Sequence, residues 1–376
     1  MFDLIGTYRS AKPLQTLAII EPLASHYDIT RIAHITGLDT LGIPTYVAYR
    51  PNSRSLSCSQ GKGVSHALAK VSAIMEAIEF HCIEHLPPAD LHGSFQVLSK
   101  TYPLYPLDTI SKTLIKVDLL ETSIDWLKGY DLINQQPIYF PRDMIGLDKS
   151  QNNLTSLALW PSSNGLASGN TYEEALCHAL FELIERDMFE TTSDRIVDLE
   201  KLTDPTCQQM VNTIQEQAKL VVTDVTNQRL SMPIYKAVIT DKANANRLSL
   251  GIVGHGCHLS AQVAFLRAIT EAAQARLTYI SGARDDIPIH LFSPQLLYRM
   301  TPKVAPNCLL QEINTMPNTM TEMLNLILDR LVTNGHGQVI VYRLTPDDCP
   351  FAVVRALIPT LSLDEASHFI HTSEVV

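Results

Sequence analysis

Residues 170–186 read Asn-Thr-Tyr-Glu-Glu-Ala-Leu-Cys-His-Ala-Leu-Phe-Glu-Leu-Ile-Glu-Arg, and this stretch combines the start signal of a helix with an unusual polar pattern. Thr171 and Glu174 have the spacing of a capping box, which predicts a helix that runs to about Phe189. The apolar side of this helix consists of Ala175, Leu176, Ala179, Leu180 and Leu183. The segment therefore predicts an amphipathic helix whose other side carries carboxylates.

The same polar spacing recurs in two further predicted helices. Apolar periodicity places one of them from about His66 to Leu86 and the other from about Ser260 to Ile280. The three helices carry polar side chains at positions i, i+4 and i+7, namely Ser72, Glu76 and Glu79, then His178, Glu182 and Glu185, then Arg267, Glu271 and Gln274. This spacing places the polar groups of each helix along one narrow line, here called its polar stripe.

Strand signals separate these helices. Residues 45–60 form a β-rich run that turn-forming residues interrupt at Arg50-Pro51-Asn52, so two strands are predicted. Residues 130–144 have the pattern of a hairpin, and residues 337–343 and 351–358 are predicted as late strands. The fold class is therefore α+β, with helices and strands in one chain.

Composition excludes several classes of protein. The 376 residues are 45% hydrophobic, which is enough to fill a large core, and no linker divides the chain into domains. A net charge of −10 argues against nucleic-acid binding through the overall field. The sequence has neither 18 consecutive apolar residues nor a secretion signal, which predicts a cytoplasmic protein without membrane association. Its seven cysteines contain no C-x-x-C pair, so no disulfide framework or zinc site is predicted.

The glutamates of the stripes have two interpretations. Carboxylates at helical spacing usually face solvent, but Glu pairs at i and i+3 repel each other unless a cation lies between them. Magnesium prefers hard oxygen ligands and often takes one or two carboxylates beside water and phosphate. The sequence therefore predicts two Mg²⁺ ions held against a triphosphate by Glu76, Glu79, Glu182 and Glu185.

Possible phosphate donors lie beside these helices. Gly61-Lys62-Gly63, Ser163-Asn164-Gly165 and Ser168-Gly169-Asn170 are predicted as loops whose glycines let the backbone approach an anion, and Arg186 adds a positive charge. None of them has P-loop or dinucleotide-loop spacing, so any nucleotide site must be of another type. Residues 254–258, Gly-His-Gly-Cys-His, are interpreted as a loop, because ligands this close in sequence cannot easily surround one metal ion.

At this point the sequence resembles the YcaO family, and the match covers most of the chain. The matching stretches are Pro51 to Gly63, Ser72 to Glu79, Asp125-Trp126 with the hairpin ending at Phe140-Pro141, Ser163 to Glu174, Glu182 to Asp187, Arg267 to Arg276, and Ser281 to Asp286. The resemblance implies a single YcaO domain over residues 1–376, with a lead-in (1–30), a catalytic core (about 31–360) and a tail (361–376). It implies a fold of mixed sheets, with helices around an ATP site that is not a P-loop.

The resemblance also assigns roles to individual residues. It implies that Glu76, Glu79, Glu182 and Glu185 bind Mg²⁺, in agreement with the reasoning from their spacing. It implies nucleotide or metal-shell contacts for Lys62, Ser72, Asn170, Glu174, Arg186, Glu271, Gln274, Arg276 and Arg284. It indicates no catalytic nucleophile in the chain itself.

The activity that the resemblance implies is activation of a peptide backbone amide by Mg-ATP. A nucleophile adds to the carbonyl, the oxygen is phosphorylated, and the product is an azoline, an amidine or a thioamide in a ribosomally made peptide or protein. The expected partners are the peptide substrate and a leader-binding, E1-like or TfuA-like protein, and a homodimer is possible. The chain ends without the proline-rich tail typical of many azoline formers, which favours thioamide, amidine or accessory roles. A second departure is Phe80, which stands where the family commonly has an arginine.

Two alternative functions fit the same glutamates. One is an ATP-binding accessory factor for another modifying enzyme, such as one that methylthiolates a ribosomal protein. The other is a carboxylate–amine ligase, which would form an acyl phosphate from a free acid. ATP turnover that depends on a small acid would favour the ligase.

Overall fold

The computed structural model describes residues 1–4, 6–107, 118–148, 162–187, 195–242, 251–282, 284, 308–310 and 316–361. Its strands form four antiparallel sheets. These sheets contain β1 (Phe2–Leu4) and β2 (Thr7–Arg9); β3 (Arg31–His34), β4 (Thr45–Tyr49) and β5 (Cys58–Lys62); β6 (Leu91–Gly93), β7 (Ile124–Asp131), β8 (Gln136–Pro141), β14 (Ile340–Arg343), β15 (Ala352–Leu357) and β9 (Leu166–Gly169); and β10 (Arg195–Ile196), β11 (Ala218–Asp224), β12 (Ile234–Asp241) and β13 (Ile252–Cys257).

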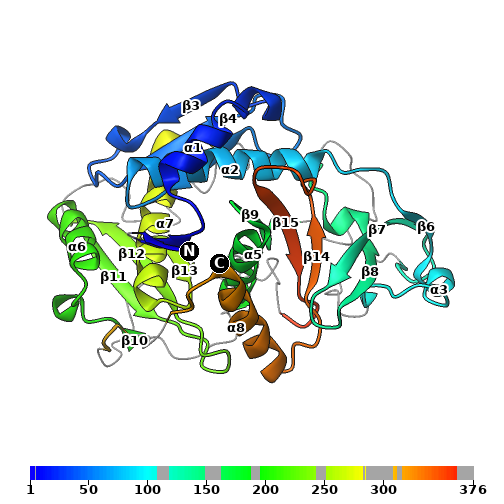
Figure 1. Cartoon of the computed structure of the whole chain (residues 1–376). Coiled ribbons are helices and arrows are strands. Elements are labelled where there is room, and N and C mark those ends of the chain that lie inside the picture. Colours follow the sequence, from blue (N-terminus) through cyan, green and yellow to red (C-terminus); the bar gives the residue numbers. More distant parts are fainter. Residues whose placement is uncertain are drawn as a thin grey trace, which may run out of the picture.

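Helices cover these sheets (Figure 1). The α-helices are α1 (Pro13–Ile20), α2 (His66–Glu84), α3 (Phe95–Leu98), α5 (Tyr172–Arg186), α6 (Pro205–Gln217), α7 (Ala261–Ser281) and α8 (Met320–Thr333). Short 3₁₀ turns are η1 (Ala24–Tyr27), η2 (Thr36–Leu38), η4 (Arg142–Met144) and η6 (Leu199–Lys201). Among the described residues, no helix combines the length and apolar character needed to cross a bilayer.

The α+β class and the three striped helices are confirmed. Helix α2 ends at Glu84, two residues before the predicted end, and the end predicted for α5 at Phe189 lies outside the described residues. The strand pair broken at residues 50–52, the hairpin and the two late strands are also present, as β4 and β5, β7 and β8, and β14 and β15. The interpretation of residues 254–258 as a loop is wrong, because residues 254–257 belong to β13 and pair with β12.

The three striped helices belong to three similar strand–helix units: β5 with α2, β9 with α5, and β13 with α7. Each helix begins at a hydroxyl side chain, Ser65, Thr171 or Ser260, which accepts a hydrogen bond from the backbone N–H three residues later. In each unit this N-cap stands seven residues before the first member of the polar stripe. The three stripes therefore begin at the same distance from the amino-terminal end of their helices.

Glycines allow the strand of a unit to lie against its own helix. A Cβ added at Gly61 would stand 2.0 Å from the Ala73 nitrogen, and one at Gly256 would stand 2.1 Å from the Ala264 oxygen. Gly61 is buried within β5, so the prediction that it belongs to a phosphate-binding loop is wrong. Its physical role is close approach of strand and helix.

We expect Gly61→Ala to destabilise the protein by about 1–3 kcal/mol, because the added methyl group would meet helix backbone that has no room to move. The free energy of unfolding in urea measures this effect. Gly37→Ala is the matched control, since a Cβ there meets nothing within 4 Å. Equal stability of the two variants would contradict the close-packing explanation.

Helix α5 lies at the centre of the molecule, between α7 and β15 (Figure 1). Its Leu180 and Leu183 are fully buried in a core shared with α8, β14 and β15. Separate cores join α7 to α6, β11 and β12, and join α2 to α1 and β4. Burial of the apolar faces of α2, α5 and α7 in these cores leaves the polar stripes to share one interior.

Candidate active site

The polar stripes meet because each strand of the three units also contacts the helix of another unit. Ser168 of β9 donates a hydrogen bond of 2.5 Å to Glu79 of α2, and Lys62 of β5 forms an ion pair with Glu271 of α7. Cys257 of β13 lies near Glu185 of α5. Burial raises the pKa of the Cys257 thiol, and the negative charge of Glu185 adds to this effect. The three units thus close into a ring, with the carboxylates facing inward.

The four predicted metal ligands carry a common electrostatic signature. Burial, with a smaller contribution from the charge of Glu182, raises the pKa of Glu76 to about 7 and that of Glu79 to about 8. Burial also raises the pKa of Glu182, and burial together with the charge of Glu271 raises that of Glu185 to about 7. Glu185 is buried and the other three carboxylates are half-buried, and a cluster of carboxylates that hinder each other's ionisation is stabilised by a cation.

Magnesium fits this donor set. The four groups offer only carboxylate oxygens, which are the hard ligands that Mg²⁺ prefers. Within the described part of the chain, no three acidic, His or Cys side chains converge closely enough to enclose one ion. That spacing suits ions held by one or two carboxylates each and completed by water and phosphate. The assignment of Glu76, Glu79, Glu182 and Glu185 as ligands stays a prediction.

Three predicted phosphate contacts face these carboxylates. Lys62 and Arg284 both lower the pKa of Glu76, and Arg186 lowers that of Glu182 and of Glu185. Burial alone would raise the pKa of Glu271, but the charges of Lys62 and Arg186 hold it at about 2. Glu271 is therefore ionised and already neutralised by the protein, unlike the four predicted metal ligands.

Two further predicted contacts lie on the walls of this interior. Gln274 of α7 donates a 2.9 Å hydrogen bond to the backbone carbonyl of Gln60 on β5, which ties the two units together. Ser72 lies on α2 one helical turn before Glu76 and is half-buried. Arg276 points elsewhere, because its guanidinium forms ion pairs with Asp39 (2.8 Å) and Asp241 (2.7 Å).

Asn170 and Glu174 form a separate network at the start of α5. Glu174 is only 1% exposed and accepts hydrogen bonds from the Ser10 backbone N–H (2.8 Å) and from the Asn170 side-chain amide (3.0 Å). The side-chain amide oxygen of Asn170 accepts a hydrogen bond of 2.6 Å from the Thr16 hydroxyl. These two residues therefore anchor the amino-terminal segment to α5.

The sequence reasoning missed several basic or polar residues of this interior. Arg9 and Ser10 reach Glu174 from the amino-terminal segment, which has no pattern that links it to α5. Arg355 is 3% exposed on β15, and its charge lowers the pKa of Glu182. An arginine inside the apolar run Ala-Val-Val-Arg-Ala-Leu (352–357) is the one sequence signal that could have found it, because buried charges are rare without a partner.

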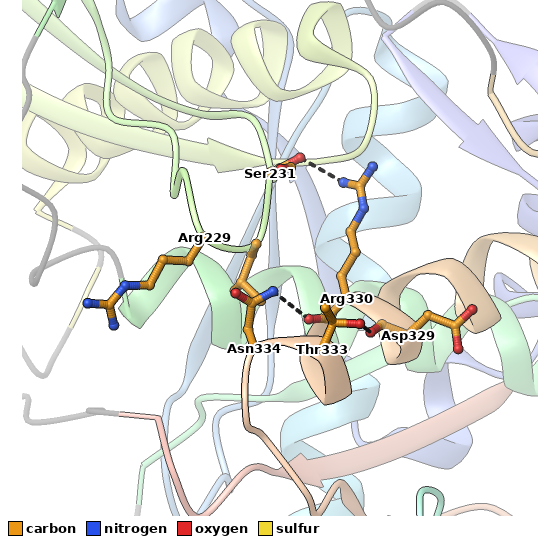
Figure 2. Close-up of a pocket in the computed structure, with 7 residues that line it drawn as sticks. Arg229, Ser231, Asp329, Arg330, Thr333 and Asn334 are labelled. Atoms are coloured by element: carbon orange, nitrogen blue, oxygen red, sulfur yellow. Dashed lines mark hydrogen bonds between the residues drawn. The ribbon is translucent and has the colours of Figure 1, made fainter.

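A surface hollow of about 290 Å³ lies away from the carboxylates, between the loop after β11 and the end of α8 (Figure 2). Its lining includes none of the predicted site residues. Arg330 there donates to the Ser231 carbonyl (2.7 Å), and the Thr333 hydroxyl donates to the carbonyl of Asp329 (2.7 Å). These groups satisfy one another, so this hollow gives no indication of a ligand.

Comparison with known proteins agrees with the site. A family model described as YcaO cyclodehydratase, ATP and Mg²⁺-binding, matches residues 60–362. A protein of Rhizobium leguminosarum bv. trifolii from the tfuA 3′ region is 34% identical over 390 residues, covering 96% of this chain and 90% of that protein.

Solved structures share the fold. YcaO from Methanopyrus kandleri, bound with AMPPCP and Mg²⁺, has a TM-score of 0.76 at 20% identity and covers 96% of this chain and 95% of its own. A heterocyclase in complex with substrate and cofactor has a TM-score of 0.75 at 20% identity, over 94% of this chain and 53% of its own. The chain therefore belongs to the YcaO family of ATP- and Mg²⁺-dependent enzymes.

Proposed function

We propose that the protein uses Mg-ATP to phosphorylate the oxygen of a peptide backbone amide and thereby converts the amide to an azoline, an amidine or a thioamide. The observation that carries this proposal is the ring of buried and half-buried carboxylates with raised pKa values, faced by Lys62, Arg186 and Arg284. Phosphoryl transfer requires little covalent chemistry from a protein and depends on positioning and charge stabilisation. This ring offers both.

Bound Mg-ATP would supply a phosphoryl group, which the amide oxygen accepts. A nucleophile, which is a Cys, Ser or Thr side chain, an amine or sulfide, adds to the carbonyl carbon, and phosphate leaves as the new C=N or C=S bond forms. The role of Glu76, Glu79, Glu182 and Glu185 is to hold the metal ions, and the three cations facing them balance the phosphate charge.

A partner protein completes this proposal. The Rhizobium relative comes from the tfuA 3′ region, which supports a TfuA-like protein as the partner. An E1-like or leader-binding protein is the alternative partner. Such a partner would present the peptide or deliver the nucleophile. Copurification of the protein with the product of an adjacent tfuA-type gene tests this part.

An isotope experiment tests the reaction itself. Candidate peptides made by neighbouring genes are labelled with heavy oxygen at the backbone carbonyls and incubated with the protein, its partner and Mg-ATP. We expect the heavy oxygen to appear in inorganic phosphate while the peptide loses water or exchanges oxygen for sulfur. Heavy oxygen that reaches phosphate only when a free carboxylic acid, and not the backbone carbonyl, carries the label would point to a ligase. ATP binding without any label transfer would point to the accessory role.

A further inference from the structure

Two exposed histidines lie side by side, and the proposed function gives neither of them a role. His34 ends β3, which is the edge strand of its sheet, and His66 is the first residue of α2. Ten residues, about 15 Å along the helix axis, separate His66 from Glu76 of the carboxylate ring. Neither imidazole makes a hydrogen bond or an ion pair with another residue in the described part of the chain. Their ring nitrogens are therefore available to a ligand from solution.

The two imidazoles have the spacing of rings that share one metal ion. Their centroids are 4.8 Å apart, and the ring planes are at 90° to each other. An ion at about 2.0–2.1 Å from one nitrogen of each ring holds the two centroids about 4.5–5.2 Å apart, the lower value for octahedral and the upper for tetrahedral angles. The observed separation falls within this range. Rotation of two exposed side chains is therefore enough to direct one nitrogen of each ring at a common ion.

The backbone around each histidine fixes where the two rings meet. His34 pairs with Tyr46 of β4, and their rings stack with centroids 4.9 Å apart. His66 directly follows Ser65, whose side chain caps α2 by accepting a hydrogen bond from the Leu68 backbone N–H. Helix α2 packs against β3 and β4 in the upper part of Figure 1. Because both backbones are already held in place, an ion that binds the two rings has only side chains to order.

Aromatic packing alone explains only part of this arrangement. Stacking on Tyr46 accounts for the position of the His34 ring, but the centroid of the Tyr46 ring is 6.0 Å from that of His66. Both histidines are exposed, so their contact buries little apolar surface. Two imidazolium charges this close repel each other, whereas a metal ion binds the neutral rings and removes the repulsion. The contact is therefore more favourable with an ion between the rings than without one.

We propose that His34 and His66 bind a divalent transition-metal ion that takes imidazole ligands, such as Zn²⁺, Ni²⁺ or Cu²⁺. Imidazole nitrogen suits these ions, whereas Mg²⁺ prefers oxygen ligands such as those of the carboxylate ring. In the part of the chain that the structure describes, no three His, Cys or acidic side chains gather around one ion, so water fills the remaining coordination positions. The bound ion joins β3 to the start of α2, the helix that carries Glu76 and Glu79.

Calorimetric titration with Zn²⁺ tests this site, with excess Mg²⁺ present to compete for the carboxylates but not for imidazole. We expect His34→Gln and His66→Gln each to weaken Zn²⁺ binding about 10-fold or more, because one imidazole alone loses the advantage of two linked ligands. His92→Gln is the matched control, since His92 is exposed on β6 and its ring contacts Asp125 at 2.8 Å. Wild-type affinity for Zn²⁺ in either His34→Gln or His66→Gln would overturn the proposal.

Thermal unfolding with and without Zn²⁺ gives a second measurement. An ion that binds only the folded state raises the melting temperature. We expect Zn²⁺ to raise it in the wild-type protein and in His92→Gln, and to raise it less in His34→Gln and His66→Gln. If His66→Gln disturbs the start of α2, His34→Gln carries the test, because His34 lies at the exposed end of an edge strand. An equal rise in all four proteins would mean that the stabilising ion binds elsewhere and would refute the site.

Discussion

Replacement of Glu76 or Glu185 by glutamine is expected to remove Mg²⁺-dependent nucleotide binding while the fold stays intact. Each substitution removes a negative charge with almost no change in volume. A charge-assisted contact is worth about 1.5–3 kcal/mol, so we expect affinity for AMPPCP in the presence of Mg²⁺ to fall by about 10- to 100-fold. Calorimetric titration with and without Mg²⁺ measures the change.

The control for this experiment is Glu216→Gln, because Glu216 is exposed on α6, outside the ring. That variant should bind AMPPCP like the wild-type protein. Far-ultraviolet circular dichroism of each variant checks that α2 and α5 remain folded. If both Glu76→Gln and Glu185→Gln keep the wild-type affinity and the wild-type response to Mg²⁺, the metal-site assignment is wrong.

The second expected result is a loss of stability with rising pH in the absence of nucleotide and Mg²⁺. Burial raises the pKa of Glu76 and Glu185 to about 7 and that of Glu79 to about 8. The folded state therefore binds more protons than the unfolded state between the ordinary glutamate pKa and these values. Under proton linkage, stability then decreases as pH rises through this window.

The effect of the raised glutamate pKa values on stability is most easily separated from other titrations between pH 6.5 and 8.5. The depressed pKa values of His178 and His258 make stability rise with pH only up to the ordinary histidine pKa, near 6.5. The stabilisation from Glu271, whose pKa is about 2, is fully present above the ordinary glutamate pKa and is lost only as pH falls below about 5. Above pH 6.5 the raised carboxylates therefore decide the slope, and Glu79, with the highest pKa among them at about 8, contributes most.

Urea unfolding in chelator at pH 6.5 and 8.5 measures this loss. We expect Glu79→Gln to be more stable than the wild-type protein at pH 8.5 and to show a smaller slope, because the uncharged amide pays no cost of burying a charge. Mg²⁺ with AMPPCP should offset the loss in the wild-type protein, since a ligand that binds only the folded state stabilises it. If stability falls equally with pH in Glu79→Gln and the wild-type protein, ionisation of Glu79 does not cause the loss.

The sequence by itself determined the local structure of this protein. The cap at Thr171 predicted the start of α5, apolar periodicity predicted α7, and the turn at residues 50–52 predicted the break between β4 and β5. The stripe spacing also placed the glutamates on one face of each helix. These features depend on neighbours within one or two helical turns, so a single chain segment contains the information.

The tertiary structure decided how the stripes combine and which residues join them. Gly61 was predicted in a loop but lies in β5, because its role is contact with the backbone of α2. Arg276 stands on the same helix as Gln274, yet Asp39 and Asp241 hold its side chain away from the ring. Neither the placement of Gly61 nor the direction of the Arg276 side chain can be predicted from neighbouring sequence, since the contacting atoms come from distant segments.

The electrostatic character of the site is also a tertiary property. Whether a glutamate has a pKa of about 8, like Glu79, or of about 2, like Glu271, depends on burial and on which cation the fold brings beside it. The same holds for Arg9 and Arg267, which lie far apart in sequence, yet the charge of Arg267 lowers the pKa of Arg9 because β2 reaches α5. The sequence determined which charges are present, and the closing of the three strand–helix units decided which of them are compensated and which are left for a ligand.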